Sequence, residues 1–548
     1  MPQNQGQWTF RIRSSDPQMN GQSGSFEVGR PAIGNHGPVG VVKTYHFSYA
    51  DGTPYFLLGT TLYNWLNRDW ALEQRTLTSL ASSPFNKVRF GLFPKWLDYN
   101  HVDPPRYPYV QRAKHEFDLD RFDPKFFSHV EERLRDLQKL GIEADIILFH
   151  PYDIWGFAKM DAAHDDAYIR YVVARLAAFR NVWWTMANEY NLWDPKLANI
   201  GLADSGPLPS KDWDRMFRVL KSADPYGHLR GIHNLGTWYD HSKPWITHVI
   251  AQEDYRVGAR TMQGRESYRK PVVIDELGYE GDTGQPWGTL TGQEELDRHW
   301  QVTLAGGYAS HGEAYVHPDG LLWWAVGGEL VGDSPARLGF LKEVMTQAPF
   351  QDLAPAPTAV MGGTALAQAG GYYLFYFRKL ATEPAQIATT DSELYKVELI
   401  DPWLMKIYAL GYTTGGIQAF TPVMAPCLLR LTKTPPGETP RTATISQLLA
   451  EFIGEPANPP AAKGRPFQLE KQYYSSEYTL DELLSNSRAR AAIEKYTPQW
   501  VKLRSEYPLL GGLPVEMLRD FVGDEAPDTA KSRFNGLAAE LLQIPTPQ

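Results

Sequence analysis

The sequence contains one cysteine, Cys427, among its 548 residues. A single thiol excludes an internal disulfide and a cysteine-rich zinc site, and it agrees with folding in a reducing compartment. The flanking sequence, APCLLRL, is largely apolar. It favours a small buried side chain at Cys427 over a reactive thiol.

Long apolar runs and clusters of basic residues are also missing. No stretch approaches the roughly 18 apolar residues of a membrane-spanning helix, and the start, MPQNQGQWTF, lacks the basic and apolar segments of a signal peptide. The chain has 54 basic and 63 acidic residues, a net charge of −9, and no basic cluster dense enough to follow a phosphate backbone. We therefore expect a cytoplasmic protein that binds neither membrane nor nucleic acid.

Aromatic residues are abundant. They make up 13% of the chain and include 17 Trp and 29 Tyr. The faces of these rings are surfaces on which sugar rings stack, although a large core uses them too. The remaining composition is that of a globular chain, and its length predicts several domains. The aromatic content thus hints at carbohydrate without proving it.

The sequence pattern changes three times along the chain. Residues 1–43 carry short alternating runs such as TFRIR and SFEV, which predict a β-rich segment too short for an independent sandwich. Residues 44–348 alternate apolar strands with amphipathic helices. Residues 349–434 return to strand-like runs, typical of a small antiparallel β domain. After a linker-like stretch, residues 440–548 predict a helical C-terminal appendage.

The region 44–348 contains eight candidate strands, the number that a (β/α)8 TIM barrel requires. A doubly wound sheet would use fewer strands and usually a glycine-rich phosphate turn, which this sequence lacks. We therefore predict an α/β protein built around a TIM barrel. The candidate strands are residues 55–63, 87–93, 142–150, 181–189, 229–235, 246–253, 271–278 and 307–315.

Polar and aromatic side chains gather at the ends of these strands. The carboxyl ends of barrel strands carry the reacting groups, because the βα loops there form the concave face. Trp323 and Trp324 are adjacent in the sequence, so we expect one to face the site and the other to pack in the core. Besides carboxylates, the side chains at these ends are Asn64, Trp65, Arg89, His150, Asn188, His233, Asn234, Tyr255, His311, Trp323 and Trp324.

Two carboxylates end hydrophobic strands, Glu189 in WWTMANEY and Glu276 in PVVIDELGY. They belong to predicted strands four and seven, which lie nearly opposite each other, so their side chains can converge across the mouth. Glycoside hydrolysis needs such a pair, one acid to protonate the departing oxygen and one carboxylate to attack the anomeric carbon. Asp275 should point away from Glu276, because successive strand residues alternate. Glu253 and Glu313 are rival candidates for the place of Glu276.

These motifs resemble glycoside hydrolase clan A, the retaining enzymes on a TIM barrel. The resemblance covers roughly residues 44–345 and is carried by Asn-Glu after strand four and Glu after strand seven. With QWTFRIRSSDP and YHFSYADGTPYFLLGTTLYNW ahead of the barrel, the chain is similar to a less characterised bacterial branch, in which a β-sandwich precedes the barrel and a small β domain follows it. Relative to that branch, this sequence starts within the last strands of the sandwich. Two alternatives stay open: the sandwich domain has been lost, or the true start of the protein lies further upstream.

The resemblance implies a role for each matching residue at the strand ends. Glu189 would be the general acid/base, Glu276 the nucleophile, and Asn188 would bind the hydroxyl next to the anomeric carbon. Arg89 would lie beside Glu276 and keep it ionised, since a nearby cation lowers the pKa of a carboxylate. Tyr255 would orient Glu276 through its hydroxyl.

Further residues are implied as sugar contacts. His150 and His233 would bind sugar hydroxyls, with a structural hydrogen bond as the alternative for each. Trp323 or Trp324 would form the floor of the subsite. The residue after Asn-Glu is Tyr190, where common members have Pro. Trp65 and His311 join the candidate substrate-binding residues through their positions at strand ends.

Two other function classes stay open. A metal-dependent hydrolase is prompted by His311, Glu313 and His317, but neither an early His-x-His pair nor an HExxH motif occurs. A barrel that binds sugar without catalysis is the second alternative. A serine hydrolase is disfavoured because no G-x-S-x-G motif is present.

The preferred hypothesis is a retaining glycoside hydrolase that needs no cofactor and no metal. We expect exo action on short oligosaccharides or glycosides, because the aromatic loop 99–112 and the chain's terminal regions would close one end of the cleft. The identity of the sugar, its anomeric configuration and its ring form do not follow from the pattern. The C-terminal helices are candidates for contacting a second subunit, with covering their own barrel as the favoured alternative.

Overall fold

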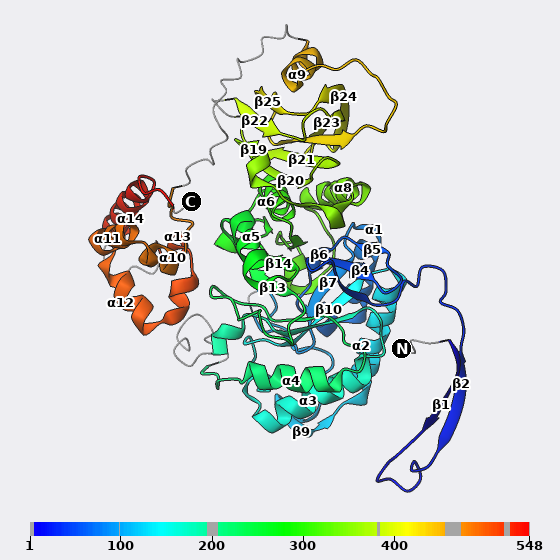
Figure 1. The fold of residues 1–548 in the computed structure, drawn as a ribbon. Coiled ribbons are helices and arrows are strands. Elements are labelled where there is room, and N and C mark those ends of the chain that lie inside the picture. The colour runs from blue at the N-terminus through cyan, green and yellow to red at the C-terminus, as the bar shows by residue number, and fades with distance from the viewer. Residues whose placement is uncertain are drawn as a thin grey trace.

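The structure, a computed structural model, describes residues 5–97, 99–193, 206–380, 384–454, 473–519 and 527–546. Its centre is an eight-stranded parallel sheet whose strands follow one another in chain order around a barrel (Figure 1). A 3.0 Å hydrogen bond from Thr247 N to Arg230 O links its two edge strands. The predicted TIM barrel is confirmed. Its strands are β6 (Leu58–Thr61), β7 (Lys87–Gly91), β10 (Glu143–Phe149), β11 (Val182–Ala187), β12 (Arg230–Gly231), β13 (Val249–Gln252), β14 (Val272–Glu276) and β16 (Tyr308–His311).

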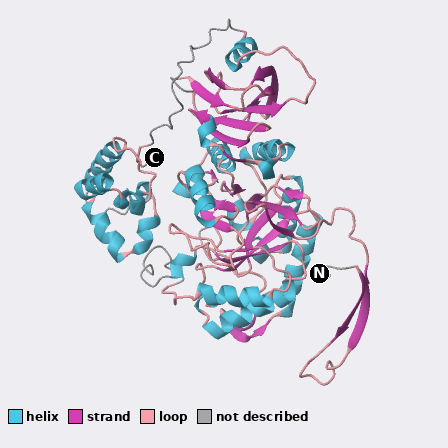
Figure 2. Ribbon diagram, viewed as in Figure 1, coloured by secondary structure: helices cyan, strands magenta, loops and turns pink. Residues whose placement is uncertain are grey.

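Helices cover the outside of the barrel (Figure 2). In α2 the Asp123 side chain caps the first turn by accepting from Lys125 N at 2.9 Å, and Pro124 supplies the restricted φ that suits this position. Residues 232–248, all of them described, form no helix between β12 and β13. The barrel helices are α1 (Trp70–Ser82), α2 (Pro124–Lys139), α3 (Ala162–Leu176), α4 (Trp213–Ala223), α5 (Val257–Tyr268), α6 (Gly292–Leu304), α7 (Trp323–Val326) and α8 (Ser334–Gln347).

The barrel interior contains a buried ion triad. Lys87 Nζ lies 2.8 Å from Asp145 Oδ2 and 2.7 Å from Asp275 Oδ1. Hydroxyl groups complete the layer, since Thr185 donates to Asp145 at 2.6 Å and Ser310 donates to Asp275 at 2.5 Å. A buried charge needs this pairing, because an unpartnered ion in the interior is very costly. Lys87 lies two residues before Arg89 on β7, so both side chains point to the same face of the strand. The triad therefore forms a layer below Arg89 and the barrel mouth.

The N-terminal residues form two small sheets. β1 (Gly6–Arg11) and β2 (Ser23–Val28) make an exposed hairpin that extends away from the barrel in Figure 1. β3 (Val39–Val42), β4 (His46–Tyr49) and β5 (Pro54–Tyr55) make a second sheet. Phe47 of β4 is fully buried and its ring lies 5.4 Å from that of Trp183. This sheet therefore packs on the amino-terminal end of the barrel. Two further pairs lie in barrel loops, β8 (Tyr109–Ala113) with β9 (Glu116–Phe122), and β15 (Glu280–Gly281) with β17 (Glu313–Ala314).

An antiparallel β region follows α8. Cys427 is buried in its core, and burial raises the pKa of this thiol to about 12, as suits the predicted unreactive side chain. Helix α9 (Ile445–Ile453) packs Ile445 and Leu448 into the same core. A domain boundary near residue 440 stays a prediction. The strands are β18 (Ala354–Pro355), β19 (Val360–Met361), β20 (Thr364–Gln368), β21 (Tyr372–Phe377), β22 (Ala385–Ala388), β23 (Leu394–Asp401), β24 (Lys406–Thr414), β25 (Ile417–Phe420) and β26 (Cys427–Lys433).

The last described residues form a group of short helices with their own core, which includes Leu483, Ile493 and Trp500. This C-terminal helical region contacts the barrel through a 3.2 Å ion pair between Arg256 and Glu482. Its use as a contact with a second subunit stays a prediction. In the described part of the chain, no helix has the length and apolar character to cross a membrane. The helices are α10 (Leu480–Ser485), α11 (Ser487–Tyr496), α12 (Pro498–Glu506), α13 (Val515–Leu518) and α14 (Pro527–Leu541).

Candidate active site

Glu189 and Glu276 both lie at the carboxyl end of the barrel. Glu276 is the last residue of β14, and Glu189 lies two residues past the end of β11. Glu189 has a left-handed backbone, with φ of 48°. Such a conformation is costly for a residue with a side chain and is concentrated at functional sites. Only 7% of Glu189 and 6% of Glu276 is exposed, so both carboxylates are nearly enclosed.

Three side chains, one from β7 and two from just beyond β6 and β12, converge on Oε1 of Glu276. Arg89 Nη1 lies 2.8 Å away, the Tyr63 hydroxyl donates a hydrogen bond to the same oxygen, and His233 Nε2 lies 3.6 Å away. Burial raises the pKa of Tyr63 well above its usual value, so the phenol keeps the proton that it donates. A guanidinium and a hydroxyl donor together stabilise negative charge on Glu276.

Asn188 connects the two carboxylates. Its Oδ1 accepts from Arg89 Nη2 and lies 3.0 Å from the oxygen of the Tyr63 hydroxyl, whose one proton is donated to Glu276, while its Nδ2 donates to Glu189 Oε2 at 3.1 Å. The Tyr152 hydroxyl donates to the same oxygen of Glu189. One continuous network therefore runs from Glu276 through Arg89, Tyr63 and Asn188 to Glu189.

The surroundings of Glu189 favour its protonated form. Burial, and then the charge of Glu276, raise the pKa of Glu189 from 4.5 to about 7. The cations of Lys95 and Arg89 and the Tyr152 hydroxyl act in the opposite direction. Near neutral pH this site therefore holds one carboxyl group that can donate a proton, beside a second that is paired with a guanidinium.

Comparison with known proteins places the chain in a family. Residues 42–319 match the family model described as the apiosidase-like catalytic domain. The chain belongs to the apiosidase-like family. A crystal structure from Bacteroides vulgatus, provisionally described as a glycoside hydrolase, is 33% identical over 79% of this chain and 89% of that chain, with a TM-score of 0.69. The protein is accordingly a glycoside hydrolase.

A more distant structure shows the same fold. A glycoside hydrolase family 5 protein from Bacteroides vulgatus is 16% identical over 76% of this chain and 98% of that chain, with a TM-score of 0.57. The resemblance to clan A barrels is thereby confirmed at the level of the fold. No curated protein matches the chain.

The two histidines predicted as sugar contacts lie at the site of this glycoside hydrolase. His233 is buried between the carboxylates, since its Nδ1 accepts from Glu189 N at 3.4 Å and its Nε2 faces Glu276. His150 lies 3.1 Å from the carbonyl oxygen of Phe93 through Nε2. Burial lowers the pKa of His150 to about 3, so this ring stays neutral. A sugar contact stays a prediction for both.

Of the three candidate tryptophans, Trp65, Trp323 and Trp324, one lies beside the site. Trp323 donates to Thr60 Oγ1 at 2.9 Å within the core, and Trp65 packs on Phe90 at a ring distance of 5.6 Å. Trp324 is the neighbour of the site, with its ring 5.2 Å from that of Tyr63. The assignments of Trp65 and Trp323 are corrected accordingly. Adjacent helical residues point in different directions, which is why only one of the tryptophans reaches the mouth.

Two other assignments are also corrected. His311 lies 3.1 Å from Thr60 Oγ1 and stacks on Phe85 at 4.7 Å, because its neighbour Ser310 takes the inward direction on β16. Tyr255 lies three residues beyond β13 and lines a separate small pocket with Leu513 of the C-terminal helical region. The hydroxyl that reaches Glu276 is that of Tyr63.

The acidic neighbours differ in their placement. Asp275 points into the barrel toward Lys87 and does not alternate with Glu276, because the pairing of β13 with β14 shifts register at this end. Glu253 pairs with Arg260 at 2.8 Å, and Glu313 accepts from two backbone amides of the 331–332 loop. Both rival carboxylates are therefore bound to other partners.

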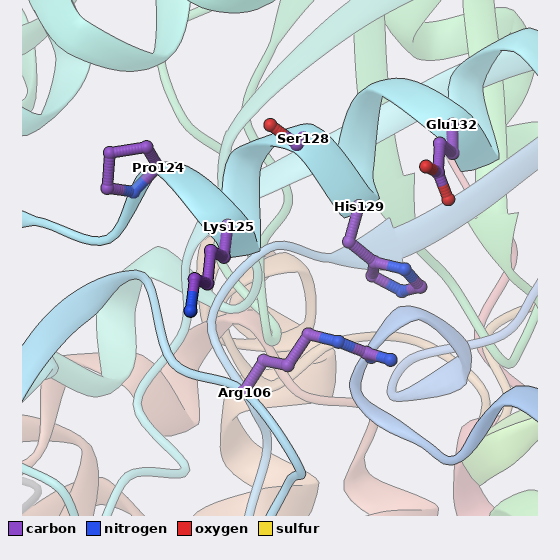
Figure 3. A pocket seen from close by; sticks show the side chains of 6 residues that line it. All are labelled: Arg106, Pro124, Lys125, Ser128, His129 and Glu132. Carbon is purple, nitrogen blue, oxygen red and sulfur yellow. The ribbon is translucent and has the colours of Figure 1, made fainter.

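The described residues contain no candidate metal centre. Among the described residues, no group of three or more histidine, cysteine or acidic side chains is placed to hold one. An open pocket of about 380 Å³ lies elsewhere, along the first turns of α2 (Figure 3). It is lined by α2 residues and by Arg106, and it includes none of the groups that surround Glu189 and Glu276.

Sequence reasoning missed three residues of the site: Tyr63, Lys95 and Tyr152. Tyr63 lies within the predicted first strand, one residue before Asn64, and Tyr152 follows His150 by two residues. Reading the residues that flank each strand end would have found both. Lys95 lies four residues beyond β7 in a loop, and the sequence carries no signal for its direction.

Proposed function

We propose that the protein is a retaining glycoside hydrolase with Glu276 as nucleophile and Glu189 as general acid/base. In the first step a Glu276 oxygen bonds to the anomeric carbon while the glycosidic bond breaks, and the Glu189 proton passes to the departing oxygen. In the second step Glu189 removes a proton from water, whose oxygen bonds to the anomeric carbon and releases Glu276. The observation that carries the proposal is the network that joins these carboxylates in opposite charge environments.

The assignment of roles follows from the partners of each carboxylate. A nucleophile must be ionised, and the Arg89 guanidinium beside Glu276 favours that form. A general acid must hold a proton, and Glu189 does so near neutral pH because burial and the charge of Glu276 raise its pKa. Once Glu276 is bonded to the sugar its charge is lost, which lowers the pKa of Glu189 and suits the later step as a base.

The substrate class follows from the family and from the enclosure of the site. The family description suggests glycosides of apiose, a branched pentose, as the first sugars to test. Two nearly buried carboxylates suit a pocket that takes a terminal sugar more than a groove that accepts a long chain. Trp324, beside Tyr63, would supply an apolar face for that sugar. We therefore favour exo action on short oligosaccharides or glycosides.

The test is hydrolysis of a panel of aryl glycosides, including apiosides and common furanosides and pyranosides. We expect one glycoside to be cleaved with retention, as read by proton NMR of the first sugar anomer released. Glu276→Ala should abolish this activity. Glu189→Ala should cleave only substrates with good leaving groups, and azide should restore turnover as a glycosyl azide of retained configuration.

Three outcomes would contradict the proposal. Inversion would exclude double displacement, activity in Glu276→Ala would exclude this nucleophile, and a lack of azide rescue would exclude the role of Glu189. Binding of a sugar without cleavage would favour a non-catalytic barrel. Arg135→Lys, a substitution on the outer face of α2, is the matched control and should keep full activity.

A further inference from the structure

A buried lysine lies among the rings of the site. Lys95 is only 3% exposed, and its Nζ lies 3.5 Å from the centre of the Tyr63 ring, 4.3 Å from that of Tyr152 and 4.9 Å from that of Trp324. An ammonium over an aromatic face is attracted by the electron-rich ring. Three rings from separate segments therefore hold one cation.

The backbone of Lys95 is held as firmly as its side chain. The Asn64 side chain accepts from Lys95 N at 2.6 Å and donates to Lys95 O at 2.8 Å. Asn100 also donates to that carbonyl at 2.8 Å, and Arg68 donates to Asn100 at 2.7 Å. Asn64 was a candidate site residue in the sequence, and its contacts show that it positions the loop that carries Lys95.

The placement links the lysine to both carboxylates. Tyr63 donates to Glu276 and Tyr152 donates to Glu189, and Lys95 lies over both rings. A cation on the ring face draws electron density from the phenol, which makes the hydroxyl a stronger donor. The titratable and charged groups that surround Lys95 and the two carboxylates are Tyr63, Arg89, His150, Tyr152, Glu189, His233, Asp254, Glu276 and Tyr279.

We propose that Lys95 is a positioning residue that strengthens the tyrosine hydrogen bonds to Glu189 and Glu276 and sets the upper pH limit at which Glu189 serves as an acid. The inference rests on the proposed function, because it concerns the same pair of carboxylates. It assigns a role to a residue outside the reacting pair, and that role can be measured. Lys95 acts through Tyr63 and Tyr152 and through its charge.

The charges around Lys95 support this role and predict the direction in which Lys95 changes the pKa of Glu189. Burial lowers the pKa of Lys95 to about 8, so it is mostly protonated near neutral pH. Its charge lowers the pKa of Glu189 against the larger effect of burial. Loss of the ammonium should therefore raise the pKa of Glu189, and the acid form should persist to higher pH.

The experiment compares pH profiles of kcat/KM for Lys95→Met, Lys95→Arg and the unchanged enzyme, with a glycoside whose leaving group needs protonation. We expect Lys95→Met to move the alkaline limb upward by about one pH unit and to lower the maximum about tenfold. Lys95→Arg keeps the charge and should leave the limb in place. Lys95→Gln provides a second neutral variant in case Lys95→Met does not fold.

If Lys95 had only a structural role, Lys95→Met would lower the activity without moving the alkaline limb of the pH profile. That result would overturn the inference. A limb that moved downward would do the same. Azide rescue of Glu189→Ala on an activated glycoside separates the two proposals. Rescue with an unmoved limb rejects only the role of Lys95, whereas no rescue rejects the role of Glu189 first.

Discussion

Arg89 Nη1 lies 2.8 Å from Glu276 Oε1, and the other terminal nitrogen of the same guanidinium donates to Asn188 Oδ1. Asn188 in turn donates to Glu189. A single fully buried cation on β7 therefore positions groups from β14 and from the end of β11. The planar fork of arginine suits this task, because it presents donors in two directions at fixed spacing.

Replacing Arg89 by lysine should weaken catalysis. One ammonium cannot take the place of both guanidinium donors, so either Glu276 or Asn188 loses a partner. We expect kcat/KM to fall about 100-fold, with a smaller change in KM than in kcat. Steady-state kinetics with circular dichroism as a folding check would measure this. Activity within about threefold of the unchanged enzyme would show that the shared contact is dispensable.

The activity of the enzyme should decline above neutral pH. Glu189 is the proposed acid and its pKa is raised to about 7, so it loses the required proton as the pH rises through that value. For a glycoside with a poor leaving group, kcat/KM should fall about tenfold per pH unit on the alkaline side. A dinitrophenyl glycoside, which needs no proton, should not show this limb. If both substrates showed the same alkaline decline in kcat/KM, a group other than Glu189 would cause that decline.

Glu143 should make stability depend on pH. It is buried on β10, and burial raises its pKa from 4.5 to about 8. Its neutral form fits the fold, so its contribution is full below the unfolded value and is lost as the pH rises through the folded value. In Glu143→Gln the amide oxygen can still accept from Trp183 Nε1, which lies 3.1 Å away, without any charge to bury.

Thermal unfolding across the pH range tests this expectation. The melting temperature of Glu143→Gln should rise relative to that of the unchanged enzyme as the pH increases from about 5 to about 9. Glu132→Gln, at a side chain that is 61% exposed, is the control and should show no such trend. A constant difference for Glu143→Gln would mean that this carboxyl has the same pKa in the folded and unfolded states.

The C-terminal helical region should depend on Arg256 for its contact with the barrel. Arg256 pairs with Glu482 at 3.2 Å and lies over the Tyr478 ring at 3.2 Å from its centre. Arg256→Ala and Glu482→Gln should each speed cleavage of this region by trypsin. Their double-mutant cycle should show a coupling of about 1 kcal/mol in the free energy of unfolding. Additive effects would mean that the ion pair adds nothing to the interface.

The barrel could be predicted because its signals are local. Apolar runs bounded by turn residues mark the eight strands, and Asp123 with Pro124 marks the start of α2. The strands are shorter than the runs, as β6 shows with four residues within the predicted 55–63. Buried loops at the barrel ends are as apolar as the strands, so composition alone does not separate them.

The placement of Glu189 and Glu276 at the barrel mouth could also be predicted, because a charged residue at the end of an apolar strand is seldom there for packing alone. The residues that orient the pair were found only in part. Arg89 and Asn188 came from strand ends, whereas Tyr255 was given the contact with Glu276 that Tyr63 makes, and the choice between Trp323 and Trp324 stayed open. Choosing between such neighbours requires the direction of each side chain beyond the end of regular structure.

The amino-acid sequence by itself determined the order of the eight strands, the helices that alternate with most of them, and the two glutamates at the carboxyl ends of two strands that face each other. Those features depend on hydrophobic periodicity and on residue type, which are written along the chain. Only the tertiary structure decided which side chains meet. The register shift that lets Glu276 depart from strand alternation, the left-handed backbone of Glu189 and the ring cage around Lys95 each depend on contacts between distant segments. No local pattern encodes those contacts, because packing between strands selects them.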